Sequence, residues 1–375
     1  MSTFIISCGG TGGHLSPGIA LAEGLIEQGH DCYLVISNKE VDSRLAQNYS
    51  HLNFIRIPGV GFSFNLKGFF RFCWEQLKSI IFAFRLLRKI KPDVVVGFGG
   101  FTSVAISLVA YFYDYPLVLH EANRRPGKAI RLLSILACRV YLPPGVHLKA
   151  ISLKTIRHIG YPIRKSIRPI SRHTACYRLD LQPDLKRLLV LGGSQGATVL
   201  NRWVVDNFEY LGNLGIHVYC VTGLGKCSKG KLDYTAENGK FIQAVFTPFI
   251  DDMGDLLSSV DLVVSRAGAG SIAEFTHCHT PSILVPYPFA ADNHQEENAN
   301  FFEKQGGTIV VNEKNLDQLC SEVESLIFDD WLLDKLQQNL KSIAIQNNLK
   351  LIMDDLATLC PYKEPVVSPM ESFYT

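Results

Sequence analysis

Long apolar runs, paired cysteines and a signal for secretion are all missing from this sequence. No stretch of about 18 uncharged apolar residues occurs, so no membrane-spanning helix is predicted. No basic segment precedes the short apolar run at residues 4–6, and we expect no signal peptide. The ten cysteines include no Cys-x-x-Cys pair, which is typical of a reduced, cytosolic protein whose cysteines are buried structurally.

Strong charge and metal-binding motifs are also missing. The formal net charge of +2 is too small to indicate a nucleic-acid partner, and no series of interleaved aromatic and basic residues is typical of an RNA-binding surface. No Asp-x-Asp pair occurs that could hold a metal on a diphosphate, so we expect no metal and no cofactor. His277, Cys278 and His279 are adjacent and cannot all face one ion from a helix; we interpret them as packing and surface residues.

The length and composition indicate two globular domains. A chain of 375 residues exceeds one ordinary core, and 47% hydrophobic with 19% charged residues excludes a disordered chain. In the first half, short apolar runs alternate with helical patterns. Strands are predicted at residues 4–8, 31–37, 93–97 and 117–120, with helices at about 16–29, where Pro17 occupies the first turn, and at about 102–113.

The second half repeats this order of strand, glycine turn and helix. A strand at 188–191 leads into Gly192–Ala197 and a helix from about Thr198, and a second buried strand begins after Asp261. Strands that alternate with helices predict an α/β fold of two Rossmann-like parallel-sheet domains. Ligands of such sheets bind outside the carboxyl ends of the strands, so we expect the site in the cleft between the domains.

The segment from Asp261 to Glu274 carries the clearest ligand signal. Glycines at 268 and 270 allow a close approach of the backbone, and the first turn of the helix predicted from Ser271 favours a phosphate. Glu274 stands one turn further on. A carboxylate there suits a neutral diol such as that of a ribose, whereas the alternative is an interaction with the helix dipole.

Six motifs in register resemble the MurG family, whose members transfer N-acetylglucosamine from UDP to lipid I and form lipid II. The motifs are Gly9–His14, His120–Asn123 with Pro126-Gly127, Gly192–Ala197, Pro248–Met253, Ser265–Ala269 with Glu274, and Asp292–Ala299. The resemblance implies a GT-B fold, with an acceptor- and membrane-binding domain (1–160), a UDP-sugar donor-binding domain (161–345), and a C-terminal helix with a loosely ordered tail (346–375). It also implies inverting transfer to the 4-hydroxyl of lipid I.

The resemblance assigns roles to individual residues. Ser194 and nearby N–H groups would bind the diphosphate, Ile250 the uracil edge, and Arg164 the diphosphate or uracil. Asp292 and Gln295 have capping-box spacing, so we expect Asp292 to cap a helix while Gln295 contacts sugar hydroxyls. The full expected donor-binding set is Thr11, Gly12, Gly13, Asn123, Arg164, Ser194, Gln195, Ile250, Ala269, Glu274 and Gln295. The family usually has Gly-Asn-Pro before its arginine, where this chain has Tyr161, and a second Gln where this chain has Glu296.

Two candidates exist for the catalytic base. His14 ends the first glycine loop, where a helix N-terminus disfavours the imidazolium and keeps the ring able to accept a proton. Glu121 is the alternative, although a carboxylate needs a raised pKa for this task.

The segment 62–91 is amphipathic and basic. Its apolar stripe comprises Phe69, Phe70, Cys73, Trp74, Leu77, Ile81 and Phe84, beside Arg71, Lys78 and Arg85. The stripe either packs in the core or contacts an anionic membrane. The resemblance favours the membrane and implies a peripheral location on the cytoplasmic face of the inner membrane. Other cell-wall synthesis proteins are candidate partners.

Three other functions fit parts of the sequence. A dehydrogenase is the first alternative, because Gly268-x-Gly270-x-x-Ala273 formally matches a dinucleotide-binding fingerprint. Against it, the match does not lie in the first strand-turn-helix unit, and no ribose-binding acid ends the next strand. A non-catalytic nucleotide-binding scaffold docked on a membrane is a second alternative. A related GT-B glycosyltransferase with another lipid acceptor is the third, and an assay with a lipid I analogue separates them.

Overall fold

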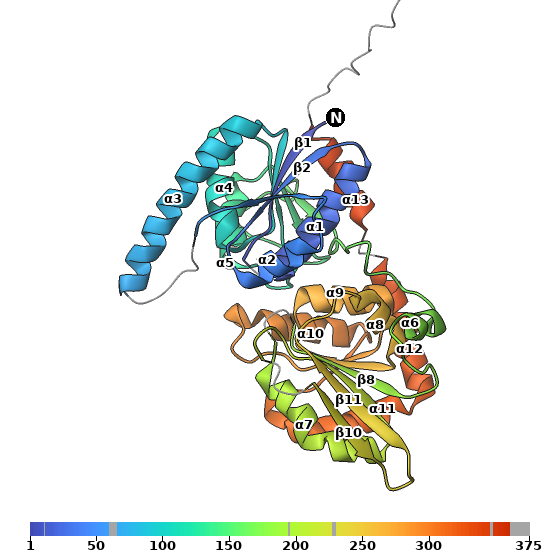
Figure 1. Ribbon diagram of the computed structural model, residues 1–375. Coiled ribbons are helices and arrows are strands. Elements are labelled where there is room, and N and C mark those ends of the chain that lie inside the picture. Colours follow the sequence, from blue (N-terminus) through green and yellow to red (C-terminus); the bar gives the residue numbers. More distant parts are fainter. Residues whose placement is uncertain (11, 60–65, 194–195, 227–229, 346–347, 361–375) are drawn as a thin grey trace, which may run out of the picture.

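Two α/β domains, each built on a mainly parallel sheet, face one another (Figure 1). Residues of both domains line a cleft between them. The computed structural model describes residues 1–10, 12–59, 66–193, 196–226, 230–345 and 348–360, with the side chains of 66–71 left undescribed. The predicted tail after residue 360 lies outside these ranges. The α/β class with two Rossmann-like domains is confirmed.

The first domain contains a seven-stranded sheet in the order β3-β2-β1-β4-β5-β6-β7, and all its pairings are parallel. Its strands are β1 (Thr3–Ser7), β2 (Asp31–Ile36), β3 (Asn53–Arg56), β4 (Val94–Gly97), β5 (Leu117–His120), β6 (Arg139–Leu142) and β7 (Ile156–His158). Its helices are α1 (Gly12–Glu27), α2 (Glu40–Gln47), α3 (Leu66–Ile90), α4 (Gly100–Phe112), α5 (Lys128–Leu133) and the 3-10 turn η1 (Ser134–Leu136).

The second domain contains a sheet in the order β10-β11-β9-β8-β12-β13-β14, where only the described pair β10–β11 is antiparallel. Its strands are β8 (Arg187–Leu191), β9 (His217–Val221), β10 (Lys231–Thr235), β11 (Phe241–Thr247), β12 (Leu262–Ser265), β13 (Ser282–Leu284) and β14 (Ile309–Val310). Its helices are α6 (Arg172–Arg178), α7 (Thr198–Asn213), α8 (Met253–Ser259), α9 (Ala269–Cys278), η2 (Ala291–Asn293), α10 (His294–Lys304), η3 (Glu313–Gln318), α11 (Leu319–Ile327) and α12 (Asp330–Ala344).

Both sheets are covered by helices on both faces, as the continuous apolar strands predicted. On β1, Phe4 and Ile6 belong to one core cluster while Ile5, between them, belongs to another. On β8, Leu188 and Leu189 divide in the same way. Because neighbouring side chains of a strand point to opposite faces, strands buried on both sides must be apolar throughout.

The last described helix, α13 (Leu349–Ala357), returns to the first domain and lies beside α1 (Figure 1). Ile352 and Leu356 are buried in the core of that domain. The Tyr141 hydroxyl donates to Asp355 Oδ2 at 2.9 Å. The first domain is therefore built from both ends of the described chain.

Several helices begin earlier than the sequence predicted. α1 begins at Gly12 and not at about Ser16, which places Pro17 inside the helix and not in its first turn. α4 begins at Gly100 and not at Thr102, and α9 begins at Ala269 and not at Ser271. In each case the last residues of the glycine turn already belong to the helix. The prediction missed them because glycine has no side chain and so adds nothing to the apolar pattern that marks a helix.

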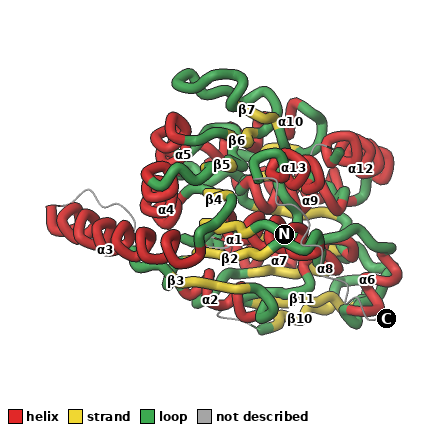
Figure 2. Tube along the Cα trace, turned by 90° about the horizontal axis from the view of Figure 1, so that it is seen from above, coloured by secondary structure: helices red, strands yellow, loops and turns green. Residues whose placement is uncertain are grey.

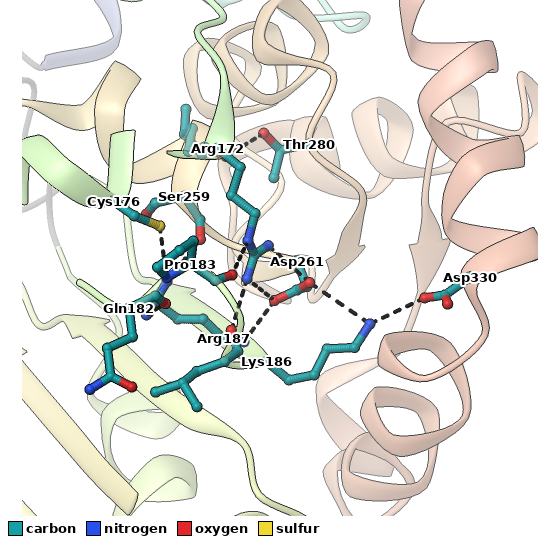
Figure 3. Close-up of polar contacts among 12 residues, drawn as sticks. Arg172, Cys176, Gln182, Pro183, Lys186, Arg187, Ser259, Asp261, Thr280 and Asp330 are labelled. Atoms are coloured by element: carbon teal, nitrogen blue, oxygen red, sulfur yellow. Dashed lines mark hydrogen bonds and ion pairs between the residues drawn. The ribbon is translucent and has the colours of Figure 1, made fainter. Parts of the chain in front are cut away.

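A polar cluster at the edge of the second sheet opposite the cleft attaches the start of α6 to that sheet (Figure 3). The Asp261 carboxylate accepts from the Arg187 backbone N–H at 2.7 Å and from Arg172 Nη2 at 3.0 Å. Lys186 lies 3.8 Å from Asp261 Oδ1 and 3.2 Å from Asp330 Oδ1. One carboxylate thus connects the start of β8, the start of β12 and the start of α6.

Asp261→Asn should destabilise the protein, because it removes the charge that accepts these hydrogen bonds. Bonds to charged groups contribute about 1.5–3 kcal/mol each, so we expect a lowered free energy of unfolding and melting temperature. Asp330→Asn is the matched control, since Asp330 is 87% exposed and exposed pairs contribute little. Equal melting temperatures for both variants would contradict this role of Asp261.

Candidate functional site

A cleft of about 930 Å³ lies between the carboxyl ends of the two sheets. Most of the sequence-predicted site residues line it, and they come from both domains. The cleft-lining members of the predicted set are Gly12, Gly13, His14, Glu121, Asn123, Arg164, Ile250, Ala269, Glu274 and Gln295. Thr11, Ser194 and Gln195 lie outside the described residues.

His14 packs against the second glycine turn of the first domain. A Cβ atom at Gly100 would lie 3.2 Å from His14 Nδ1, and one at Gly99 would lie 3.6 Å from Nε2. Both glycines have positive φ, at 93° and 72° for Gly99 and Gly100. The two glycine turns therefore fit together, and the absence of side chains on one leaves room for the imidazole on the other.

The surroundings of His14 keep its ring neutral. Burial lowers the pKa of His14 to about 4, while the Asp42 carboxylate opposes this shift and Lys39 and His294 add to it. Asp42 is itself buried and accepts from the Gly10 N–H at 2.7 Å. The imidazole is consequently unprotonated at neutral pH and able to accept a proton.

Tyr161 compensates for the proline in α1. Pro17 has no N–H, so it cannot donate to the Gly13 carbonyl four residues earlier. The Tyr161 hydroxyl donates to that carbonyl instead, at 3.2 Å. The same hydroxyl would lie 2.9 Å from a Cβ at Gly270, so Tyr161 fills the space between the N-termini of α1 and α9. This residue, which departs from the family pattern, thus contacts a glycine turn of each domain.

Glu121 organises the loop that follows β5. Its Oε1 accepts from the backbone N–H and the side-chain Nδ2 of Asn123, at 2.8 and 2.9 Å, and its Oε2 accepts from the Gly127 N–H at 2.7 Å. Burial raises the pKa of Glu121, and these hydrogen bonds act against the shift. Both carboxylate oxygens are therefore engaged by the loop itself, which favours a structural task for Glu121.

Arg164 and Glu274 form a largely buried ion pair within the second domain, at its seam with the first. Arg164 Nη2 lies 3.1 Å from Glu274 Oε1, and Arg164 Nη1 donates to the Tyr49 hydroxyl at 3.3 Å. Burial acts to lower the pKa of Arg164, but its pairing with Glu274 and Tyr49 raises it above the usual value. Glu274 also lies beyond the first turn of α9, where the helix dipole has little effect.

Two further turns of the second domain bring backbone to the cleft. Gly192 sits against Gly196 and Ala197, where an added Cβ would lie 2.0 Å from the Ala197 nitrogen. Gly268 precedes α9 and leaves the first N–H groups of that helix at the cleft wall. Such turns suit an anionic ligand.

The capping-box interpretation of Asp292 and Gln295 is wrong. No side-chain cap bond is made at the start of η2 or α10, and Asp292 instead forms an ion pair with Arg131 of the first domain. Gln295 Oε1 accepts from the Tyr287 N–H at 3.0 Å. Asp292 and Asn293 both have positive φ, which the spacing of residues does not reveal. The bond to Tyr287 fixes the orientation of the Gln295 amide at the cleft.

Sequence reasoning missed several residues that line the cleft. Tyr49 follows α2 without any motif, and only the fold brings it to Arg164. Arg266 pairs with Glu313 and donates to the Val285 carbonyl at 3.1 Å, so it supports the loop that ends at Gln295. The buried Arg266 lies within the motif Ser265–Ala269, so the sequence did contain an indication of it. Within the described residues, no group of three or more His, Cys, Asp or Glu side chains could hold a metal ion.

Two models of known protein families match this chain. The model described as "Glycosyltransferase family 28 N-terminal domain" matches residues 4–142, and "Glycosyltransferase family 28 C-terminal domain" matches residues 187–356. The fold and the cleft are therefore those of a GT-B glycosyltransferase.

Two curated relatives share one name, "UDP-N-acetylglucosamine--N-acetylmuramyl-(pentapeptide) pyrophosphoryl-undecaprenol N-acetylglucosamine transferase". The protein from Opitutus terrae is 49% identical over 356 residues, covering 95% of this chain and 94% of that protein. The one from Halothermothrix orenii is 34% identical over 366 residues, covering 94% and 98%. The chain therefore belongs to the family of these transferases, the MurG family that its motifs resemble.

Solved structures agree in fold. The crystal structure of Acinetobacter baumannii MurG matches with a TM-score of 0.68 at 20% identity, covering 96% of this chain and all of that one. A putative UDP-N-acetylglucosamine 2-epimerase from Listeria monocytogenes matches nearly as well, with a TM-score of 0.67 at 13% identity and coverage of 96% of both chains. The fold is thus shared by different activities and does not by itself select one.

Proposed function

We propose that this protein transfers N-acetylglucosamine from UDP-N-acetylglucosamine to the 4-hydroxyl of lipid I, with inversion at the sugar carbon, and so forms lipid II. The observation that carries the proposal is the cleft shared by both domains, with His14 and Asn123 on one side and Glu274 and Gln295 on the other. The 49% identity with a transferase of that name over 95% of the chain supports this donor and acceptor.

In the proposed reaction, a ring nitrogen of His14 takes the proton of the acceptor hydroxyl. The oxygen then attacks the anomeric carbon as the bond to the diphosphate oxygen breaks, and UDP leaves with the bonding electrons. Glu274 binds the ribose diol, and Gln295 binds sugar hydroxyls. Backbone N–H groups of the glycine turns, with Arg164, meet the charge of the leaving group.

The test uses the purified protein with UDP-N-acetylglucosamine and a lipid I analogue. We expect UDP release that requires both substrates, together with a disaccharide product. UDP binding without turnover would support the non-catalytic scaffold, and turnover with a different lipid acceptor alone would support a related transferase.

A membrane contact through α3 belongs to this proposal. In the described part of the helix, the buried face includes Ser79, Ala83 and Leu87, while Trp74 is 60% exposed. The exposed apolar side chains are Trp74, Leu77, Ile81 and Phe84. Exposed Lys78, Arg85, Arg88 and Lys89 lie beside them. The core interpretation of this part of the stripe is therefore wrong, whereas the side chains of Phe69 and Phe70 lie outside those described.

The shape of the molecule also supports the membrane contact. Figures 1 and 2 both show α3 projecting beyond the body of the first domain. Exposed Phe112, Leu132 and Ile135 lie on α4, α5 and η1 of the same domain. Among the described helices, none is both long and apolar enough to cross a bilayer. An exposed apolar stripe flanked by basic residues suits the surface of an anionic membrane.

Replacing Trp74 and Phe84 with Ser should weaken binding to anionic vesicles by about tenfold or more. The reason is that each aromatic side chain contributes about 1.5–3 kcal/mol when it moves from water into the apolar part of the membrane. Trp331→Ser is the matched control, since Trp331 is 74% exposed on the other domain. Sedimentation with vesicles measures the effect, and turnover of a water-soluble acceptor should stay unchanged. An equal loss of vesicle binding in both variants would argue against a site on α3.

His14→Ala should lower kcat by about 10²–10⁴, the usual contribution of a general base, with UDP affinity nearly unchanged. Because the pKa of His14 is about 4, the base is lost only by protonation as the pH falls toward that value. The wild-type pH profile should therefore stay flat from neutral pH to about 5. His158→Ala, an exposed histidine of the same domain, is the control. Retained turnover in His14→Ala would return the role to Glu121 or water.

Glu274→Ala should raise the KM for UDP-N-acetylglucosamine strongly, since charge-assisted hydrogen bonds contribute roughly 1.5–3 kcal/mol each, while the acceptor KM changes little. The sharper measurement compares UDP with 2′-deoxy-UDP. Wild type should prefer UDP, and the variant should lose that preference. Glu303→Ala, whose carboxylate accepts from the Val310 N–H away from the cleft, should behave as wild type. An undiminished preference would show that Glu274 does not bind the diol.

A further inference from the structure

Asn298 is a buried polar side chain at the seam between the two domains. It lies in α10 of the second domain and is only 1% exposed. Its side-chain Nδ2 donates to Asn123 Oδ1 and to the Ala267 carbonyl, both at 3.1 Å, and its Oδ1 accepts from the Arg124 N–H at 2.9 Å. Both hydrogens of the amide nitrogen and the oxygen are thus engaged, which fixes the orientation of the amide.

The three partners belong to different parts of the cleft. Asn123 and Arg124 come from the loop after β5 in the first domain, and Asn123 in turn donates to Glu121. Ala267 stands directly before the turn that opens α9. Gln295 lies one turn earlier than Asn298 on the same helix. A single amide therefore connects the loop of one domain to two donor-side elements of the other.

Arg124 strengthens the same connection through its side chain. Its guanidinium lies 3.7 Å from the centroid of the Phe301 ring on α10, and its Nη1 donates to the Pro144 carbonyl at 2.6 Å. Backbone and side chain of Arg124 thus both contact α10. The loop after β5 is attached to the second domain at two adjacent points.

We propose that Asn298 is a positioning residue that sets the acceptor-domain loop 121–124 against the donor site, so that the attacking hydroxyl and the anomeric carbon are aligned. This inference rests on the proposed transfer reaction. The physical reason is that a displacement of about 1 Å between reacting groups can cost on the order of 10²-fold in rate. Asn298 has no contact with the reacting atoms in this role and acts through Asn123 and Arg124.

Two variants separate positioning from packing. Asn298→Ala removes all three bonds, whereas Asn298→Asp keeps the shape but places a carboxylate oxygen against the Asn123 and Ala267 oxygens. We expect both to lower kcat by about 10–100-fold, with the Kd for UDP within about twofold of wild type. Asn339→Ala is the matched control, because that amide donates to the Gly306 carbonyl within the second domain at 2.8 Å.

Hydrogen exchange tests the connection without any assay of activity. The Arg124 N–H loses its acceptor in Asn298→Ala, so a peptide spanning 121–127 should exchange faster, while a peptide spanning β8 and α7 should exchange as in wild type. Faster exchange in both peptides would indicate general destabilisation and overturn the proposal. A wild-type protein without transferase activity would refute the proposed function, whereas the exchange result would still test the connection.

A double-variant cycle tests the route through Asn123. If Asn298 acts through that residue, Asn123→Ala and Asn298→Ala should be non-additive in kcat, the double variant losing little more than the worse single one. Three outcomes overturn the proposal: an Asn298→Asp enzyme with wild-type kcat, a UDP Kd that rises as much as kcat falls, or additive losses in the cycle.

Discussion

The cleft depends on one constraint, which is that polar groups buried between the two domains must find partners there. The structure meets it in three ways. Glu121 is satisfied within its own loop, Arg164 pairs with Glu274 and donates to Tyr49 of the opposite domain, and Asn298 joins loops of both domains. An unpaired charge in such a place would cost several kcal/mol, so the contacts of Arg164 with Tyr49 and of Asn298 with Asn123 also restrict how the domains can sit. Binding residues and seam residues are therefore largely the same residues.

Much of the fold followed from local patterns in the sequence. Continuous apolar runs predicted the strands of both sheets, because a strand covered on both faces has no polar side, and the glycine turns marked their carboxyl ends. The exact helix starts could not be predicted, since Gly12 and Gly100 carry no side-chain pattern. An amphipathic helix such as α3 has the same sequence pattern whether its apolar side is covered by the protein or exposed. Only the packing of Ala83 and Leu87 decides between them.

The site was predictable where residues stand in a sequence motif and not where they come from distant elements. The family motifs located Glu274 and Gln295, both at the cleft. No pattern pointed to Tyr49. The spacing of Asp292 and Gln295 matched a capping box, but the Asp292 carboxylate pairs with an arginine more than 150 residues away in the sequence. Sequence spacing carries no information on such a partner. Tyr161 departs from the family pattern, and only the structure explains why a tyrosine fits there. Its hydroxyl donates to the Gly13 carbonyl, which Pro17 leaves without its helical donor.

The return of α13 to the first domain has a consequence for how the chain reaches its folded state. Tyr141 and Asp355, which share a hydrogen bond, are 214 residues apart, and the whole second domain lies between them. During synthesis the segments of the first domain emerge before the second domain, yet Ile352 and Leu356 complete the core of the first domain only after the second has been made. The first domain is thus finished after the second. Until then, the apolar surface of the first domain that α13 covers stays in contact with water or with a chaperone.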